Sequence, residues 1–469
     1  MARRFVLVLG ALGTAAAGLL VWLSCTAAEK PPGAEAWQPP RLVQVEGAEG
    51  WRNLFPGNGL WFVSAGADGR AAVLAQDGDI LASAKAKGGE DSLFPYEAGD
   101  GLTLKFTFDG PRMLLKGKTV CLTLTAQGGG WDWLKAAKPE DLAALRFVNL
   151  PEAIEPAAEK LVAIALLTSL AARNERLGLI LGHSSGVTEV LPLFQPRWLS
   201  LGDVNLDKNE LDVLARQERI ETLVLGGKNL WTLAFLKQFR SLRRLAINEW
   251  DPEKAGPIPA GCDRLETLVL MGPKLKDFSP LANLPRLSSL GLLGCPLPAD
   301  AAAWGKLAGL RTLILNGSAG LEDLGGLREL KDLRWLGLPA NVSPKQLADL
   351  VREHPDLIGV EVVNCEQVTD LVPLRALKRP EFLVLLNKDK KFEDLGPLRD
   401  LKSLKLVVLT EKTFKESPDR VEELKKALPG AQVVMGAPVC LGSGWILALF
   451  PAVGAAWLVR KRAWRRDSR

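Results

Sequence analysis

A serine in a glycine-rich turn is the feature of this 469-residue sequence whose residue types best suit catalysis. The run from Gly182 to Gly186 reads Gly-His-Ser-Ser-Gly, and an apolar stretch that predicts a strand leads into it. A sharp turn after a strand can expose a serine hydroxyl for attack on an acyl group, provided that a histidine removes its proton. Ser184 would be that nucleophile, and His354 is the only histidine downstream of it.

The elements around this turn do not favour catalysis. The motif resembles the nucleophile elbow of α/β-hydrolases, which implies several strands before the elbow and an acid followed by a histidine after it. The strand before Ser184 instead falls in register with a leucine period, and His354 falls within one of the repeats. We therefore expect a Gly/Ser-rich repeat turn and no enzyme, with a serine hydrolase using Ser184 as a minor alternative.

Metal, cofactor and nucleic-acid sites have no support in the sequence. Two histidines and six cysteines without a Cys-x-x-Cys pair predict no zinc site. The net charge of +5 resides at the ends, because residues 460–469 carry +5 and Arg3 and Arg4 add +2, which leaves −2 for the body. A nearly neutral body is not suited to a polyanion. We expect no cofactor, no metal and no nucleic-acid partner.

A repeat of the form Leu-x-x-Leu-x-Leu organises most of the chain. Its last two apolar positions recur at intervals of 22–24 residues, a period that chance does not maintain over ten units. These pairs are Leu199/Leu201, Leu223/Leu225, Leu245/Ile247, Leu268/Leu270, Leu290/Leu292, Leu313/Leu315, Leu336/Leu338, Val360/Val362, Leu383/Leu385 and Val407/Leu409. Leu177/Leu179 is expected to add a unit before them, and residues 428–434 a closing strand.

An aspartate precedes an apolar turn between several of these predicted strands. Asp277, Asp370 and Asp394 each stand shortly before a Pro-Leu pair, and the leucines that follow are often spaced by threes. An aspartate in this place can accept hydrogen bonds from the free N–H groups that open a helix. The pattern therefore predicts short helical or 3₁₀ turns packed on the layer of strands.

Residues 177–435 resemble internalin-type leucine-rich repeats, whose units read Asp-Leu-x-Pro-Leu-x-x-Leu-x-x-Leu-x-x-Leu-x-Leu. The resemblance implies an α/β repeat fold: a curved solenoid with a parallel sheet on the concave side and short helices on the convex side. It also implies a buried spine in which an Asn or Cys three residues after each strand bonds neighbouring backbones. Cys295, Cys365 and Asn341 occupy that position here, whereas Ser318 departs from the pattern. The resemblance does not identify a ligand, because repeat proteins change partners by changing surface residues.

One side chain in each unit stands between the two strand leucines and points away from the core. This column is largely apolar, where a solvated sheet face favours polar residues, so we expect a ligand-binding surface. The candidate ligand contacts in this column and beside it are Arg244, Val269, Ile314, Trp335, Glu361 and Phe382. Two alternatives stay open: a second domain covers the column, or the column reflects generic strand preferences.

The first 28 residues predict export. Arg3 and Arg4 precede an apolar run over residues 5–23, and small residues follow it. Three fates fit this pattern: cleavage after Ala28, lipidation of Cys25 in a Leu-Ser-Cys box similar to that of bacterial lipoproteins, or an uncleaved anchor. Residues 29–40 form a Pro-rich linker.

The opposite end predicts a transmembrane helix. Residues 438–459 carry no charge and have about the ~20-residue length that a bilayer requires, with Trp445 and Trp457 toward the edges. The basic tail 460–469 follows at once, which places that end in the cytoplasm and the body outside. A sorting tag removed after export, or a buried helix, also fits the segment.

Two further segments precede the repeats. Alternating apolar residues and frequent glycines predict a small β-rich domain over 41–130, and the Ala/Leu-rich segment 131–176 is expected to be a helical cap of the solenoid. Together these features predict an exported, membrane-anchored protein of the cell envelope or surface that binds a protein or an extended polymer. A self-assembling structural component of the envelope is the alternative.

Overall fold

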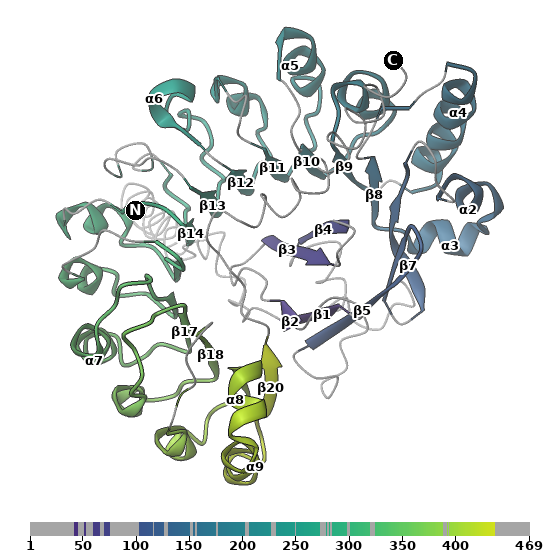
Figure 1. Ribbon diagram of the computed structural model, residues 1–469. Coiled ribbons are helices and arrows are strands. Elements are labelled where there is room, and N and C mark those ends of the chain that lie inside the picture. Colours follow the sequence, from purple (N-terminus) through teal and green to yellow (C-terminus); the bar gives the residue numbers. More distant parts are fainter. Residues whose placement is uncertain are drawn as a thin grey trace, which may run out of the picture. The chain divides into compact units, whose positions relative to one another are not determined.

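Parallel strands, one from each repeat, form the main sheet of the computed structural model (Figure 1). Parallel pairing runs without interruption from β7 to β20. These strands are β7 (Lys118–Thr123), β8 (Phe147–Leu150), β9 (Gly178–Leu181), β10 (Trp198–Leu201), β11 (Thr222–Leu225), β12 (Arg244–Asn248), β13 (Thr267–Met271), β14 (Ser289–Leu293), β15 (Thr312–Ile314), β16 (Trp335–Gly337), β17 (Gly359–Val363), β18 (Phe382–Leu386), β19 (Leu406–Thr410) and β20 (Gln432–Gly436). The predicted leucine-rich-repeat solenoid is confirmed.

The structure describes residues 103–436 together with four earlier strands, β1 (Leu42–Val45), β2 (Trp51–Arg52), β3 (Leu60–Ala65) and β4 (Arg70–Ala75). Gaps in the described part fall at 116, 126–129, 151–152, 155–156, 175–176, 202–205, 227–230, 249, 273–277, 279–280, 282–283, 298–300, 319–323, 388–391 and 393. The predicted signal segment 1–28 with Cys25, the linker 29–40, the span 438–459 and the tail 460–469 lie outside the described residues, as does most of the 41–130 segment.

The strands before the parallel ladder pair in mixed directions. β1 is antiparallel to β2 and parallel to β5 (Thr103–Asp109). β5, β6 (Arg112–Leu115) and β7 form an antiparallel meander that joins the ladder, and β3 pairs with β4 as a separate hairpin. β strands are therefore present within 41–130, as the alternating pattern predicts.

The structure differs from the sequence-based expectation at the start of the ladder. The segment 131–176, expected to be a helical cap, also contains β8, which pairs in parallel with both β7 and β9. Leu179 and Leu181, rather than Leu177 and Leu179, pair with Leu199 and Leu201. In this unit, the two leucines that belong to the buried rows therefore lie two residues later in the sequence than expected.

Helices connect the strands and lie along one side of the row of strands (Figure 1). The helices are α2 (Gly130–Ala136), α3 (Pro139–Ala144), α4 (Ala157–Arg173), α5 (Lys208–Leu214), α6 (Pro252–Ala255), α7 (Pro344–Glu353), α8 (Glu411–Glu416) and α9 (Pro418–Ala427), with short turns η2 (Gly186–Val190), η3 (Leu191–Leu193), η4 (Ala234–Gln238), η6 (Ala301–Leu307), η7 (Gly325–Glu329), η8 (Val372–Ala376) and η9 (Gly396–Asp400). Asp370 accepts a hydrogen bond from Val372 N at 2.9 Å, and Asp394 one from Gly396 N at 2.7 Å. The predicted role of aspartate at the start of these turns is confirmed at both sites.

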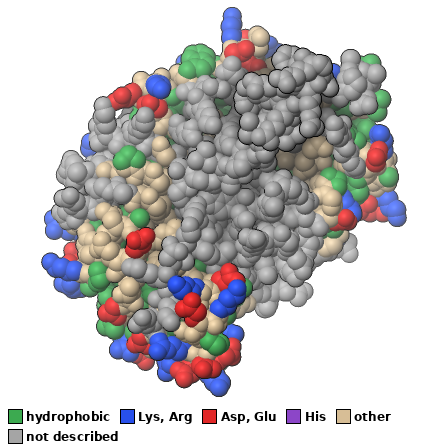
Figure 2. Space-filling view, in the orientation of Figure 1, with side chains coloured by type: hydrophobic (Ala, Val, Ile, Leu, Met, Phe, Trp, Pro, Cys, Tyr) green, Lys and Arg blue, Asp and Glu red, His purple; other side chains and the backbone are tan. Residues whose placement is uncertain are grey.

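Ion pairs connect neighbouring repeats at the surface. Arg243 bonds Glu266 at 3.0 Å, and Lys405 bonds Glu381 at 2.7 Å, in each case across one strand-to-strand step. Charged side chains of both signs are interspersed where described residues are visible in Figure 2. Pairs exposed to this degree contribute about 1 kcal/mol or less each. Apolar packing therefore provides most of the stability.

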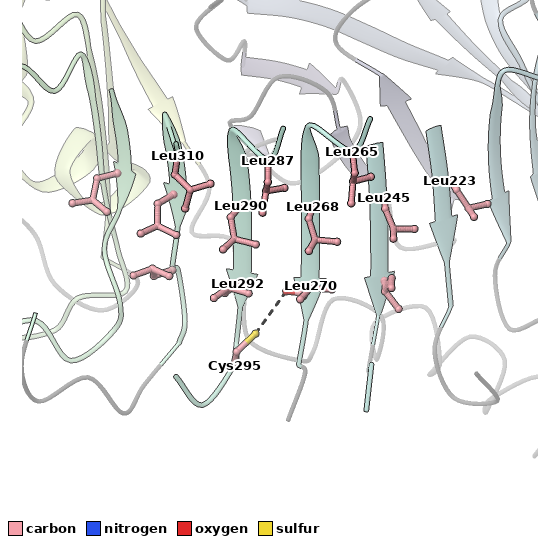
Figure 3. Packing of buried hydrophobic residues seen from close by; sticks show 14 of the residues in the cluster. Leu223, Leu245, Leu265, Leu268, Leu270, Leu287, Leu290, Leu292, Cys295 and Leu310 are labelled. Atoms are coloured by element: carbon pink, nitrogen blue, oxygen red, sulfur yellow. Dashed lines mark hydrogen bonds between the residues drawn. The ribbon is translucent and has the colours of Figure 1, made fainter. Parts of the chain in front are cut away.

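The core is a set of leucine rows between the sheet and the helices. Leu223 pairs with Leu245, Leu245 with Leu268, and Leu268 with Leu290 in the parallel register. All four side chains are buried, and they line up across neighbouring strands in Figure 3. Each buried leucine stabilises the fold by about 1.5–3 kcal/mol relative to an exposed one. The leucine period is thus the direct cause of the ladder.

Candidate functional site

Ser184 lies in the turn between β9 and η2, as the sequence predicts, but its partner is a carboxylate. An interaction with its hydroxyl lowers the pKa of Glu210 of α5, and Glu210 Oε2 has no hydrogen-bond partner among the described residues. Burial and the neighbouring Asp207 raise the pKa of Glu210, while the Ser184 hydrogen bond lowers it. Asp207 itself caps α5 by accepting from Asn209 N at 2.8 Å. The contacts of Ser184 therefore join two adjacent repeats.

The predicted base, His354, is not near Ser184. It follows the last turn of α7, just before β17, whereas Ser184 follows β9. Eight strand-to-strand steps separate β9 from β17, which corresponds to roughly 38 Å along the sheet. His354 is buried, and burial lowers the pKa of its imidazole. The structure does not bring the two residues together as a nucleophile and its base.

The candidate ligand contacts form two columns on the face of the sheet opposite the leucine rows. We call the first residues of the strands, from Thr222 to Leu406, the first column, and the residues two positions later, from Val224 to Val408, the second column. Hydrogen-bonded register places the members of each column side by side. Arg244, Trp335 and Phe382 belong to the first column, and Val269, Ile314 and Glu361 to the second. All six side chains are buried.

Two aromatic pairs in the line of the first column each meet across a glycine. Trp335 and Phe382 lie on either side of Gly359 with ring centroids 5.6 Å apart. Phe147 and Trp198 likewise meet at 4.8 Å beside Gly178. A Cβ at Gly359 would lie 2.0 Å from the Trp335 ring, and one at Gly178 would lie 2.7 Å from Phe147. The missing side chains allow the rings to lie over the neighbouring strand.

Three polar side chains, one from each column and one from the loop after β15, meet at one carboxylate; we call Glu361, Trp335 and Asn316 the Glu361 cluster. Asn316 Nδ2 donates to Glu361 Oε2 at 2.5 Å, and Trp335 Nε1 donates to Oε1 at 2.9 Å. Glu361 is 2% exposed and Asn316 1%. Burial raises the pKa of Glu361 to about 7, although both hydrogen bonds lower it. A carboxyl group is thus held away from water on the sheet face.

A glycine also makes room for Asn316. Gly337 pairs with Glu361 in the second column, and a Cβ there would lie 2.8 Å from Asn316 Oδ1. Without that Cβ, the carboxamide extends over the backbone to the carboxylate. The strand pattern predicts Trp335 and Glu361 as site residues but not Asn316, which belongs to the loop after β15. The sequence does carry a signal for this cluster: two glycines, Gly337 and Gly359, precede the only charged residue of the second column, Glu361.

Arg244 is the other charged side chain among the candidate contacts. It is buried in the first column, and its Nη1 donates to Thr222 Oγ1 of the preceding strand at 2.9 Å. Several repeats separate it from Glu361, since β12 and β17 are five strand steps apart. Arg244 and Glu361 therefore lie at different places on the sheet face.

The predicted spine contains both cysteines but a different set of polar partners. Cys295 N donates to Ser318 Oγ at 3.0 Å, and Cys365 N donates to Asn387 Oδ1 at 2.8 Å. Asn341, expected in the spine, lies at an exposed turn position, and Ser318, which departs from the family pattern, is buried in it. The path of each loop after its strand decides which side chain turns inward, and a fixed offset from the strand does not specify that path.

The thiols of the described cysteines are not suited to metal or redox chemistry. Cys121, Cys262, Cys295 and Cys365 are all buried and unpaired. Burial raises the pKa of the Cys365 thiol to about 12, so the thiolate that metals and oxidants require is disfavoured. Within the described ranges no group of three His, Cys, Asp or Glu side chains is placed to hold a metal ion. Nor does any helix of the described part have the length and apolarity to cross a membrane.

Comparisons with known proteins give similar solved structures but no family. No protein-family model matches the sequence, and no curated protein is similar to it. Among solved structures, an internalin from Listeria monocytogenes is 17% identical over 69% of this chain and 84% of its own, with a TM-score of 0.32. A leucine-rich-repeat protein of Leptospira interrogans is 16% identical over 67% of this chain and 89% of its own, with a TM-score of 0.35. A chain of the mouse RP105/MD-1 complex is 15% identical over 76% of this chain and 54% of its own, with a TM-score of 0.38.

Proposed function

We propose that this leucine-rich-repeat solenoid is an exported, membrane-attached binding protein that holds a protein or an extended polymer on the two columns of its sheet face. The observation that carries the proposal is the largely apolar composition of the second column. Val224, Ala246 and Val269 follow one another in the second column, and Val384 and Val408 continue it beyond Glu361. A sheet face that is exposed to solvent carries mainly polar side chains. A largely apolar column, with Glu361 as its one charged member, instead favours contact with an apolar partner over contact with water.

Export and membrane attachment rest on the terminal segments of the sequence. The charged residues before the apolar run 5–23, and the basic tail after the uncharged run 438–459, support a body that is translocated and an end that is retained. The body also has few features that would direct it to nucleic acid, because its charge is near zero. A protein or polymer ligand in the envelope or at the cell surface fits these features.

Site-specific photo-crosslinking tests the proposal. The photoreactive analogue p-azidophenylalanine replaces Phe382 in the first column of the full-length chain, and Phe414 of α8 on the helical side serves as the matched control. After irradiation in the native membrane fraction, we expect intermolecular products from position 382 and none from position 414. Products confined within the chain at position 382, or equal yields from both positions, would contradict binding through the sheet face.

Self-assembly is the second candidate, and α4 supplies its supporting observation. Leu161 and Val162 on this helix are 76% and 53% exposed, and such adjacent apolar side chains could contact a second copy of the chain. Cross-links between two copies of the chain would favour this function over binding of a different partner. A serine hydrolase gains no support, because Ser184 and His354 are far apart.

A further inference from the structure

The Glu361 cluster has more hydrogen-bond acceptors than donors. Two N–H groups, from Asn316 and Trp335, reach the carboxylate. Asn316 Oδ1, on the same carboxamide, is buried without any hydrogen-bond partner. Among the described residues no Lys, Arg or His contacts Glu361, so its negative charge has no counter-ion there. A buried acceptor left unpaired costs about 1–3 kcal/mol, and a buried carboxylate without a cation costs more.

The fold makes specific room for this unfavourable arrangement. Trp335 reaches the carboxylate only because Gly359 has no side chain, and Asn316 reaches it only because Gly337 has none. An apolar residue in place of Glu361 would continue the second column from Ile314 to Val384 without any of these requirements. Replacing a buried charge by an apolar side chain is commonly neutral or stabilising. The charge is therefore better explained by a bound group than by stability.

We propose that the Glu361 cluster binds the ammonium group of a lysine side chain from a protein ligand. An ammonium group supplies three N–H donors and one positive charge. Among the described residues the cluster has no donor for Asn316 Oδ1 and no cation for the Glu361 carboxylate. One donor would reach the Glu361 carboxylate and another Asn316 Oδ1. The inference rests on the proposed function, since the ligand's chain would lie along the same two columns, and it specifies what that ligand must carry.

Binding of an ammonium group to this cluster is linked to a proton. The pKa of Glu361 is raised to about 7 by burial, so near neutral pH about half of the Glu361 side chains are neutral acids. The side chains that flank Glu361 from β16, β18 and the loop after β15 are Trp335, Gly337, Phe382, Val384 and Asn316, none of which titrates in this range. A cation prefers the carboxylate, and binding should therefore tighten as the pH rises through 7.

Calorimetric titration of the full-length chain with hexalysine tests the inference, with Nε-acetylated hexalysine as the uncharged comparison. Three proteins are compared at about pH 6 and about pH 8: the wild type, Glu361→Gln and Glu353→Gln. The Glu353 substitution removes the same charge from an exposed position on α7. We expect wild type and Glu353→Gln to bind hexalysine about tenfold more tightly at the higher pH, the ratio that a group with a pKa near 7 imposes. Glu361→Gln should bind at least about tenfold more weakly at that pH, without the pH dependence.

Each other outcome overturns the inference. Equal binding by wild type and Glu361→Gln would show that the charge is not used, and equal binding of acetylated hexalysine would show that the ammonium group is not recognised. No binding of hexalysine to any of the three proteins would also reject the site. A Trp335→Phe variant, which keeps the ring and removes the donor, should retain most of the affinity. Cross-links from position 382 to a partner would survive all of these failures, so the proposed function is tested separately.

Discussion

Trp335 reaches Glu361 across a glycine. Its indole Nε1 donates a 2.9 Å hydrogen bond to Oε1 of Glu361, although the two residues belong to neighbouring strands and to different columns. The ring lies against Gly359, the first residue of the strand that carries Glu361. The position of the indole, and with it the hydrogen bond to the carboxylate, therefore depends on the absence of one methyl group.

Substituting Gly359 with alanine should destabilise the chain. The new Cβ would stand 2.0 Å from the Trp335 ring, so the ring or the strand must move. Overpacking of this kind costs about 1–3 kcal/mol. Urea unfolding of the full-length protein measures the loss, and Gly305→Ala is the control, because a Cβ at that position would meet no atom within 4 Å beyond its chain neighbours and local helix backbone. A similar midpoint shift in both variants would contradict the steric explanation.

Glu361 should make stability depend on pH in a defined direction. Burial raises its pKa from 4.5 to about 7, so the folded state holds the proton more tightly than the unfolded state does. The resulting stabilisation is fully present below about pH 4.5 and is lost as the pH rises to about 7 and beyond. A shift of this size corresponds to roughly 3 kcal/mol.

The variant Glu361→Gln isolates this contribution, because glutamine does not titrate. Its free energy of unfolding, relative to wild type, should increase by roughly 2–3 kcal/mol between about pH 5 and about pH 8. Urea unfolding at a series of pH values gives the difference curve, in which the other titrating groups cancel. A flat difference curve would mean that Glu361 keeps an ordinary pKa in the folded protein.

The leucine period was sufficient to predict the sheet and its register over most of the chain. Leu223, Leu245 and Leu268 lie side by side because one strand per repeat, each with the same apolar positions, can bury its leucines only by stacking on its neighbours. Strand β8 was missed because it is four residues long and lies in an Ala/Leu-rich segment that is otherwise helical. The helix-forming composition of this segment therefore led to a helical prediction, despite the short apolar run of β8.

The candidate site was predictable only in part. Trp335 and Glu361 could be placed on the sheet face, because alternation along a strand fixes the face on which each side chain lies. The contribution of Asn316 could not, since it lies 45 residues from Glu361 and reaches it from a loop. The contact requires the open space over Gly337, and that requirement becomes visible only when the strands are placed side by side.

Truncating a leucine of the core should test the stacked arrangement. Leu268 is completely buried between its counterparts Leu245 and Leu290, and its replacement by alanine should cost about 2–5 kcal/mol. Leu161→Ala makes the same chemical change at a side chain that is 76% exposed, and it should alter stability by about 0.5 kcal/mol or less. Thermal or urea unfolding of both variants gives the comparison. Equal effects would be inconsistent with a leucine spine.

Ser184 should not react as a catalytic nucleophile. Its hydroxyl interacts with a buried carboxylate, Glu210, and neither histidine of the described residues bonds it, because His354 is eight strands away and buried and His183 Nδ1 bonds Ser185 Oγ at 3.1 Å instead. Without such a base a serine hydroxyl is a weak nucleophile. Treatment of the full-length chain with a fluorophosphonate probe, followed by peptide mass spectrometry, should therefore find no adduct on Ser184, while a serine hydrolase treated in parallel is labelled. An adduct at this residue that disappears in Ser184→Ala would require a base supplied by another part of the chain and would reopen the hydrolase assignment.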